Sequence, residues 1–203
     1  MAGKTLREKF EESYAAVSVP ANNKQGFKIR YVYSAPWYVW DVPREKLRRE
    51  KRKIALFSLV SFLPYLFAVT VPSALNRMPV VFLPSMLALC CHILELSGVV
   101  QFLAARYQTT KFTYEEVNRI LRFVPLLRAG GSLFAGAACL YGLAVEQAGL
   151  PAVWMCLGFW LSAAAAWAVE HWYSRLPLSY ELNTNAEKYE SAMPSGKAEE
   201  TEE

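Results

Sequence analysis

Four long apolar runs fill the centre of this 203-residue chain, and each ends at basic or turn-forming residues. They cover about residues 54–75, 79–105, 124–146 and 151–172. A helix needs roughly 20 apolar residues to cross the hydrocarbon core of a bilayer, and each run approaches or exceeds that length. A soluble domain rarely contains four such runs in succession. The sequence therefore predicts an all-α integral membrane protein with four transmembrane helices in two antiparallel hairpins.

The runs also define the expected domain organisation. Residues 1–53 form a polar N-terminal region, and residues 54–175 form the four-helix membrane domain with an inner loop at 106–123. The tail at 176–203 is acidic, and from about Glu187 it is rich in Glu, Ser and Ala. A segment with so few apolar residues cannot build a core, so most of this tail is predicted to be disordered.

Basic residues are distributed unevenly between the two ends of the runs. They crowd the segment before the first run and the loop at 106–123, whereas the two other connections contain only Arg77. Short loops rich in Lys and Arg remain on the cytoplasmic side of a membrane. We therefore expect a multi-pass protein of the cell membrane with both termini in the cytoplasm.

Two patterns occur in the N-terminal region. Leu6, Phe10, Tyr14 and Val17 recur at helical spacing, which predicts a short amphipathic helix. Apolar and basic residues then alternate over Phe27–Tyr33, which predicts a strand. Because a lone strand is unstable in water, we expect it to pair across subunits or with the sheet edge of another protein.

Aromatic and basic residues meet just before the first run. Trp37, Tyr38 and Trp40 fit either the aromatic belt of a membrane interface or a surface for docking a partner. Each basic residue near a membrane surface attracts anionic lipid with about 1 kcal/mol. The residues assigned to headgroup contact are Arg48, Arg49, Lys51, Arg52 and Lys53. Lipid contact and orientation explain this stretch without a nucleic-acid partner.

Ionisable residues inside the runs are the strongest candidate site. His92 and Glu95 lie three residues apart on one helix face, about 20 Å and about 24 Å from the outer end of the second run at Pro79. A charge at that depth is costly unless it is paired. Arg128 lies about 27 Å from the outer end of the third run near Glu146, at a matching depth. We therefore predict an interhelical Glu95–Arg128 pair that also includes His92.

Three interpretations of this cluster remain open. It is a structural polar clamp between helices, a proton or substrate site in a transporter, or a metal or haem site. The spacing His-x-x-Glu alone provides too few ligands for a metal, and His171 is the only other histidine. We therefore expect neither a metal nor another cofactor.

Small residues recur at helical spacing in the last two runs, where they allow helices to approach closely. The predicted seam consists of Gly131, Ala135 and Gly136 in the third run, and Gly158, Ser162 and Ala166 in the fourth. We expect these two runs to pack tightly on each other, or one seam to serve a dimer. The first run lacks a seam and contains Pro64 and Pro72, so we expect it to face lipid or a partner.

Catalytic motifs are missing from the sequence. It contains no Gly-rich phosphate loop, His-pair metal site or Ser/His/Asp constellation, so we expect no enzyme. One remaining hypothesis is a membrane subunit or scaffold that docks a protein partner, or a second copy of itself, through its N-terminal region. The alternative is a small oligomeric transporter or channel subunit that uses Glu95 and His92.

Overall fold

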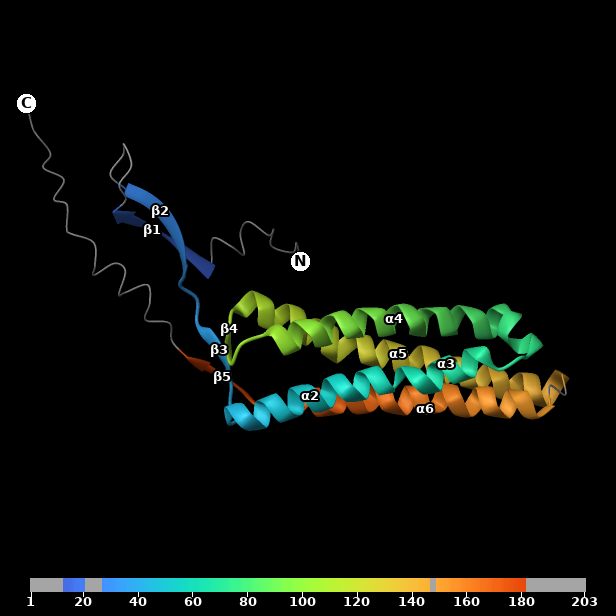
Figure 1. The fold of residues 1–203 in the computed structure, drawn as a ribbon. Helices are drawn as coiled ribbons and strands as arrows, with labels where there is room; N and C mark the ends of the chain where they lie inside the picture. Colours follow the sequence, from blue (N-terminus) through green and yellow to red (C-terminus); the bar gives the residue numbers. More distant parts are fainter. Residues whose placement is uncertain (1–12, 21–26, 147–148, 182–203) are drawn as a thin grey trace, which may run out of the picture. The chain divides into compact units, whose positions relative to one another are not determined.

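The computed structural model describes residues 13–20, 27–146 and 149–181. Four helices in these ranges are long and apolar enough to span a membrane (Figure 1). They cover Arg44–Thr70, Pro79–Ala104, Lys111–Val145 and Gly149–Ser174. The prediction of four helices able to cross a membrane is therefore confirmed.

The first of these helices is divided at Ser61 into α2 (Arg44–Val60) and α3 (Phe62–Thr70). Pro64 explains the division, because it has no N–H for the carbonyl of Val60 and its ring crowds that carbonyl. The N–H of Ser61 still donates to the carbonyl of Phe57 at 2.9 Å, so the backbone continues in the same hydrogen-bonding pattern up to the break. A short 3₁₀ helix, η1 (Ala74–Arg77), follows α3.

The other three helices are continuous. Helix α4 (Pro79–Ala104) begins with proline, whose missing N–H has no effect at a helix start. Helix α5 (Lys111–Glu146) begins within the stretch 106–123 and continues into the third span. Its early residues are amphipathic and extend the apolar run as one helix. Helix α6 (Gly149–Ser174) starts at a glycine with φ of +67°, a backbone conformation that side chains disfavour.

One face of helices α2 and α3 packs against α4 and α6. A methyl group at Gly158 of α6 would lie 2.8 Å from the carbonyl oxygen of Pro64 and 2.9 Å from Cβ of Ala68, so this glycine provides the space for the Pro64 turn. The rest of the first span faces away from the bundle, since only 28% of its most apolar window is buried, the smallest share of the four spans. The first run therefore exposes most of its surface, as the sequence suggested.

The predicted small-residue seam serves several helix pairs instead of one. A methyl group at Gly131 of α5 would meet the Pro84 carbonyl oxygen of α4 at 3.0 Å, and one at Gly136 would meet the Trp160 ring of α6 at 2.4 Å. Gly136 thus lies between the third and fourth spans as expected. Ala166 of α6 also lies there, because it packs in a small buried cluster with Ala129 of α5. The remaining members, Ala135 and Ser162, are buried.

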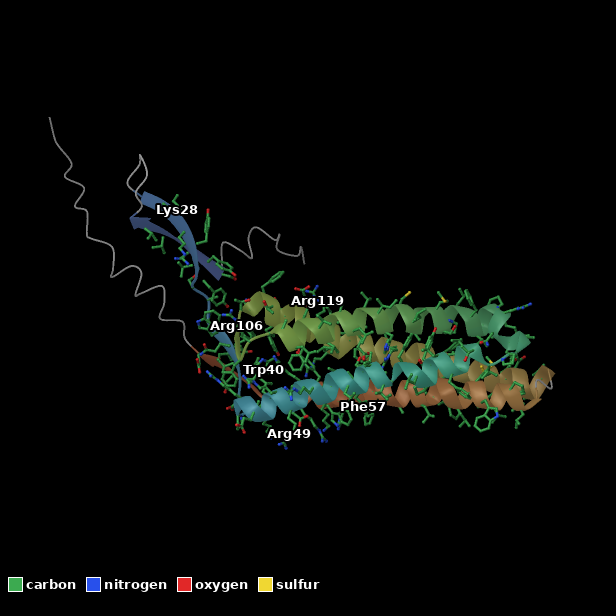
Figure 2. All side chains as sticks on the ribbon, viewed as in Figure 1. Lys28, Trp40, Arg49, Phe57, Arg106 and Arg119 are labelled. Atoms are coloured by element: carbon green, nitrogen blue, oxygen red, sulfur yellow. The ribbon has the colours of Figure 1, made fainter. Side chains whose placement is uncertain are left out.

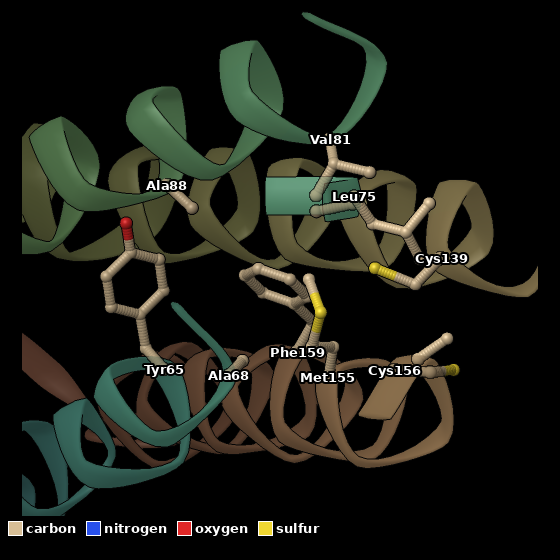
Figure 3. Close-up of a cluster of buried hydrophobic side chains, with 11 residues drawn as sticks. Tyr65, Ala68, Leu75, Val81, Ala88, Cys139, Met155, Cys156 and Phe159 are labelled. Carbon is tan, nitrogen blue, oxygen red and sulfur yellow. The ribbon is translucent and has the colours of Figure 1, made fainter. Parts of the chain in front are cut away.

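A cluster of buried apolar side chains fills one part of the bundle (Figure 3). Its members are Tyr65, Ala68, Leu75, Val81, Ala88, Ala135, Cys139, Ala152, Met155, Cys156 and Phe159. The outer surface of the helices is also apolar. Large side chains that are 60% exposed or more occur in every span, and they include Leu56, Leu83, Ile93, Phe134 and Leu161. An exterior of this kind suits lipid, because a soluble protein rarely exposes such a large apolar surface.

The N-terminal region contains a β-hairpin. Strand β1 (Tyr14–Pro20) pairs antiparallel with β2 (Phe27–Tyr33) in a register that runs from Tyr14 opposite Tyr33 to Pro20 opposite Phe27. The predicted strand over β2 is present, but its partner is in the same chain. The helix predicted through Tyr14 and Val17 is wrong there, because this segment also alternates and β-branched valines favour a strand. The rest of that predicted helix lies outside the described residues.

A second sheet has the strand order β4 (Gln108–Thr109), β3 (Trp37–Trp40) and β5 (Leu178–Glu181). The expectation of an all-α fold is therefore wrong to the extent of two small sheets. Beside this sheet the Tyr33 hydroxyl donates to the Pro36 carbonyl and accepts from the N–H of Lys111, both at 2.9 Å. Burial raises the pKa of Tyr33, which keeps the donating proton in place. The disorder predicted from about Glu187 onward concerns residues outside the described ranges.

Candidate intramembrane polar site

Six polar side chains meet in the interior of the helical bundle. They come from the first three spans and are at most 3% exposed: Ser58, Ser61, His92, Glu95, Arg128 and Ser132. His92 and Glu95 share the inward face of α4, and Arg128 and Ser132 lie one turn apart on the inward face of α5. The structure thus brings together all three residues of the predicted cluster.

An ion pair links α4 to α5. Nε of Arg128 lies 3.1 Å from Oε2 of Glu95. The other carboxylate oxygen of Glu95 accepts a hydrogen bond of 2.6 Å from the hydroxyl of Ser58 on α2. Bonds of this kind, in which one partner is ionised, are roughly twice as strong as neutral ones. The carboxylate is therefore held from two helices at once.

The guanidinium of Arg128 also reaches the break in the first span. Its Nη1 donates to the hydroxyl oxygen of Ser61 at 3.0 Å, and that hydroxyl donates to the carbonyl of Ser58 at 2.6 Å. Ser61 lies where α2 ends and α3 begins. The break thus places a hydroxyl oxygen where the arginine can use it.

His92 is fixed on both sides. Its Nδ1 contacts Nη1 of Arg128, and its ring stacks on Phe62 at a centroid distance of 4.7 Å. Arginine is a donor only, so Nδ1 must accept and the imidazole is neutral, with its proton on Nε2. The cluster therefore combines a carboxylate, a guanidinium and a neutral imidazole.

This arrangement can join three spans and balance the charge of Glu95 with that of Arg128. It does not resemble a metal centre: in the described part of the chain, no group of three or more His, Cys, Asp or Glu side chains is placed to hold a metal ion.

Trp40 lies in the interior of the helical unit. Its ring makes edge contacts with Phe102 at 5.4 Å, Tyr114 at 5.8 Å and Tyr173 at 6.3 Å, measured between centroids. It is 2% exposed, so it cannot be the docking aromatic that the sequence suggested.

The two other predicted aromatics are half-buried in the small sheets. The ring of Trp37 packs on Tyr33, and the ring of Tyr38 packs on Tyr180, each at a centroid distance of 4.7 Å. Both rings thus contribute to packing in the N-terminal region.

Lys51 differs from the other basic residues of α2. Its ammonium donates to the carbonyl of Ala105 at 2.5 Å and lies 5.0 Å from the centre of the Phe102 ring. Ala105 caps the C-terminus of α4, where unpaired carbonyls attract cations. The predicted headgroup role is therefore wrong for Lys51, which is buried. The four others, Arg48, Arg49, Arg52 and Lys53, are exposed, and Figure 2 labels Arg49.

Three members of this cluster, Ser58, Ser61 and Ser132, were not predicted from the sequence. A usable signal existed, because Ser58 and Ser61 are the polar residues in the first half of the first apolar run. Measured from the outer end of that run near residue 75, Ser61 and Ser58 lie at about 21 Å and about 26 Å, close to the depths of Glu95 and Arg128.

The helices and their apolar exterior are those of a multi-pass membrane protein. No protein-family model, curated protein or solved structure matches the chain.

Proposed function

We propose that this chain is a non-enzymatic membrane subunit or scaffold that docks a protein partner through its N-terminal region. The observation that carries the proposal is the exposed apolar face of the β1–β2 hairpin. Alternate side chains along a strand share a face, and so do directly opposed residues of an antiparallel pair, so Ile29 and Tyr31 share a face with Ala16. Ile29 is 55% exposed and Tyr31 is 59% exposed.

The hairpin also offers backbone groups for pairing. Within the described residues, each strand of this sheet has one neighbour, so each presents an outer edge. Strand edges bind extended segments of other proteins by adding a strand, and side chains on the adjoining face give specificity. Ile29 and Tyr31 would provide that specificity.

The polar cluster acts in this proposal as a clamp that keeps the membrane anchor rigid. Arg128 engages Glu95, Ser61 and His92, which accounts for its buried charge without a transported substrate.

We further propose that the protein lies in the cell membrane with both termini in the cytoplasm. The support is the density of basic residues before the first span and between the second and third. Cysteine-free protein with single cysteines at Lys46 and Arg77 tests this in intact cells. A membrane-impermeant maleimide should label only position 77. Labelling at position 46 alone would show that the protein has the opposite orientation.

Photocrosslinking tests the docking role. A photoreactive amino acid at Ile29 should yield a specific crosslinked protein in cells, whereas one at Ile93, equally exposed but on a membrane helix, should yield lipid adducts. The variant Ile29→Asp should also lose the partner in affinity purification from mild detergent. Unchanged recovery of every associated protein from this variant would refute docking through the hairpin.

One observation favours a second candidate, a small oligomeric transporter or channel subunit. Glu95 and His92 place a carboxylate and a neutral imidazole on the same inward face of α4, and buried Glu and His side chains form the proton relays of many pumps and transporters. Purified protein in liposomes with a pH gradient distinguishes the two. A transporter would lose proton flux in Glu95→Gln, whereas a scaffold would show no flux and would keep its partner.

A further inference from the structure

Five buried polar atoms of the cluster have no hydrogen-bond partner among the described residues. They are Nε2 of His92, Oε2 of Glu95, Nε and Nη2 of Arg128, and Oγ of Ser132. All four side chains are at least 97% buried. Leaving such groups unsatisfied destabilises a protein, and proteins usually avoid this with ordered water.

The hydrogens on these atoms define what they can bind. Nε2 of His92 carries a proton, because Nδ1 faces the Arg128 guanidinium, and Nη2 of Arg128 carries two more. The unmatched groups are therefore mainly donors, and they require a molecule that accepts hydrogen bonds. An acceptor is also present nearby: Oε2 of Glu95 faces Nε of Arg128 at 3.1 Å but is not aligned for a hydrogen bond.

Charge balance restricts the ligand further. The carboxylate of Glu95 already neutralises the guanidinium of Arg128. An anion would leave a net negative charge among apolar helices, where uncompensated charge costs several kcal/mol. A cation would meet the donor hydrogens of His92 and Arg128. The chemistry of the site therefore favours an uncharged molecule that both accepts and donates hydrogen bonds.

We propose that the cluster is an internal water site between α4 and α5. Water accepts hydrogen bonds from Nε2 of His92 and Nη2 of Arg128, contacts the hydroxyl of Ser132, and donates to the carboxylate of Glu95. This hydrated site does not depend on the proposed partner, because it follows from the interior of the helices alone.

Radiolytic labelling tests the site in the intact protein. Hydroxyl radicals generated by an X-ray pulse modify side chains next to bound water, including buried ones. In lipid nanodiscs, His92 should be oxidised several-fold faster than Met155, after correction for intrinsic reactivity. Met155 is the matched control, because it is fully buried in the apolar cluster of the same bundle. Labelling of His92 no faster than Met155 would overturn the proposal.

A crystal structure with bromide in the buffer provides the second measurement. Density within hydrogen-bonding distance of Nη2 of Arg128 and Nε2 of His92, without an anomalous signal, is the expected result. An anomalous bromide peak there would overturn the uncharged ligand in favour of an anion. The water site itself would be overturned if those two atoms made hydrogen bonds directly to protein groups in the crystal structure.

Discussion

The guanidinium of Arg128 and the carboxylate of Glu95 form an ion pair, Nε to Oε2, of 3.1 Å between two helices that are able to span a membrane. Both side chains are almost completely buried. A buried pair of this kind is not in itself a source of stability, because each ion loses its hydration. The pair affects stability most when one partner is replaced, because the other partner is then left as an isolated buried charge.

Charge reversal is the most direct test of this pair. Glu95→Arg and Arg128→Glu should each lower the free energy of unfolding by about 3–5 kcal/mol, because each creates two like charges in the interior. The double variant should recover much of that loss. Thermal unfolding in detergent and the yield of monodisperse protein measure the effect. A double variant no better than the worse single one would contradict a direct pairing.

Ser58→Ala should destabilise the protein by about 1.5–3 kcal/mol, since it removes the 2.6 Å hydrogen bond to the Glu95 carboxylate. Ser97→Ala is the matched control, because Ser97 is exposed on α4 and donates only to the carbonyl of Leu94 in its own helix. Chemical unfolding of the two variants side by side compares them. Equal effects would mean that Ser58 does not support Glu95.

Two glycine substitutions should have opposite effects. Gly158→Ala places a methyl group 2.8 Å from the Pro64 carbonyl oxygen and should lower stability by about 1–3 kcal/mol through overpacking. Gly130→Ala has no atom within 4 Å of its added methyl group and should be neutral or stabilising by up to about 1 kcal/mol, because alanine favours helices. Melting temperatures measure both, and a stable Gly158→Ala variant would refute the close approach of α3 and α6.

Lys51→Met should lower the melting temperature, with a loss of about 1–3 kcal/mol, because the carbonyl of Ala105 loses its charged donor. Lys46→Met makes the same chemical change at an exposed position of α2 and should be nearly neutral. Hydrogen exchange near residue 105 provides a local measurement. Faster exchange at the end of α4 only in Lys51→Met is the expected pattern, and equal exchange in both variants would exclude the cap.

Features that depend on the length of an apolar run, or on the depth of a residue within it, could be predicted from the sequence. Each of the four apolar runs forms one of the four helical spans. The rise per residue placed Glu95 and Arg128 at one level, and antiparallel helices bring equal levels together. Ser58 and Ser61 were not predicted to join them, because hydroxyls inside helices usually bond to their own backbone.

Features decided by partners distant in the sequence could not be predicted. The spacing of Tyr14 and Val17 fits a helix, but pairing with Phe27–Tyr33 selects a strand, and periodicity does not reveal that partner. From the sequence, Lys51 is indistinguishable from the other surface charges of its segment, because the end of α4 that it contacts is distant in the sequence. Gly158 was predicted as part of a small-residue seam, but the sequence does not indicate that it packs against Pro64.

The position of the ion pair in the chain restricts the order of membrane insertion. Glu95 is synthesised before Arg128, which lies in the next span, so a nascent chain that ends after α4 carries an unpaired acid. Such a truncated chain should be extracted from membranes by alkaline carbonate, whereas one that extends through α5 should resist. We expect α4 to remain beside the insertion machinery until α5 emerges, so that the two helices enter the bilayer together.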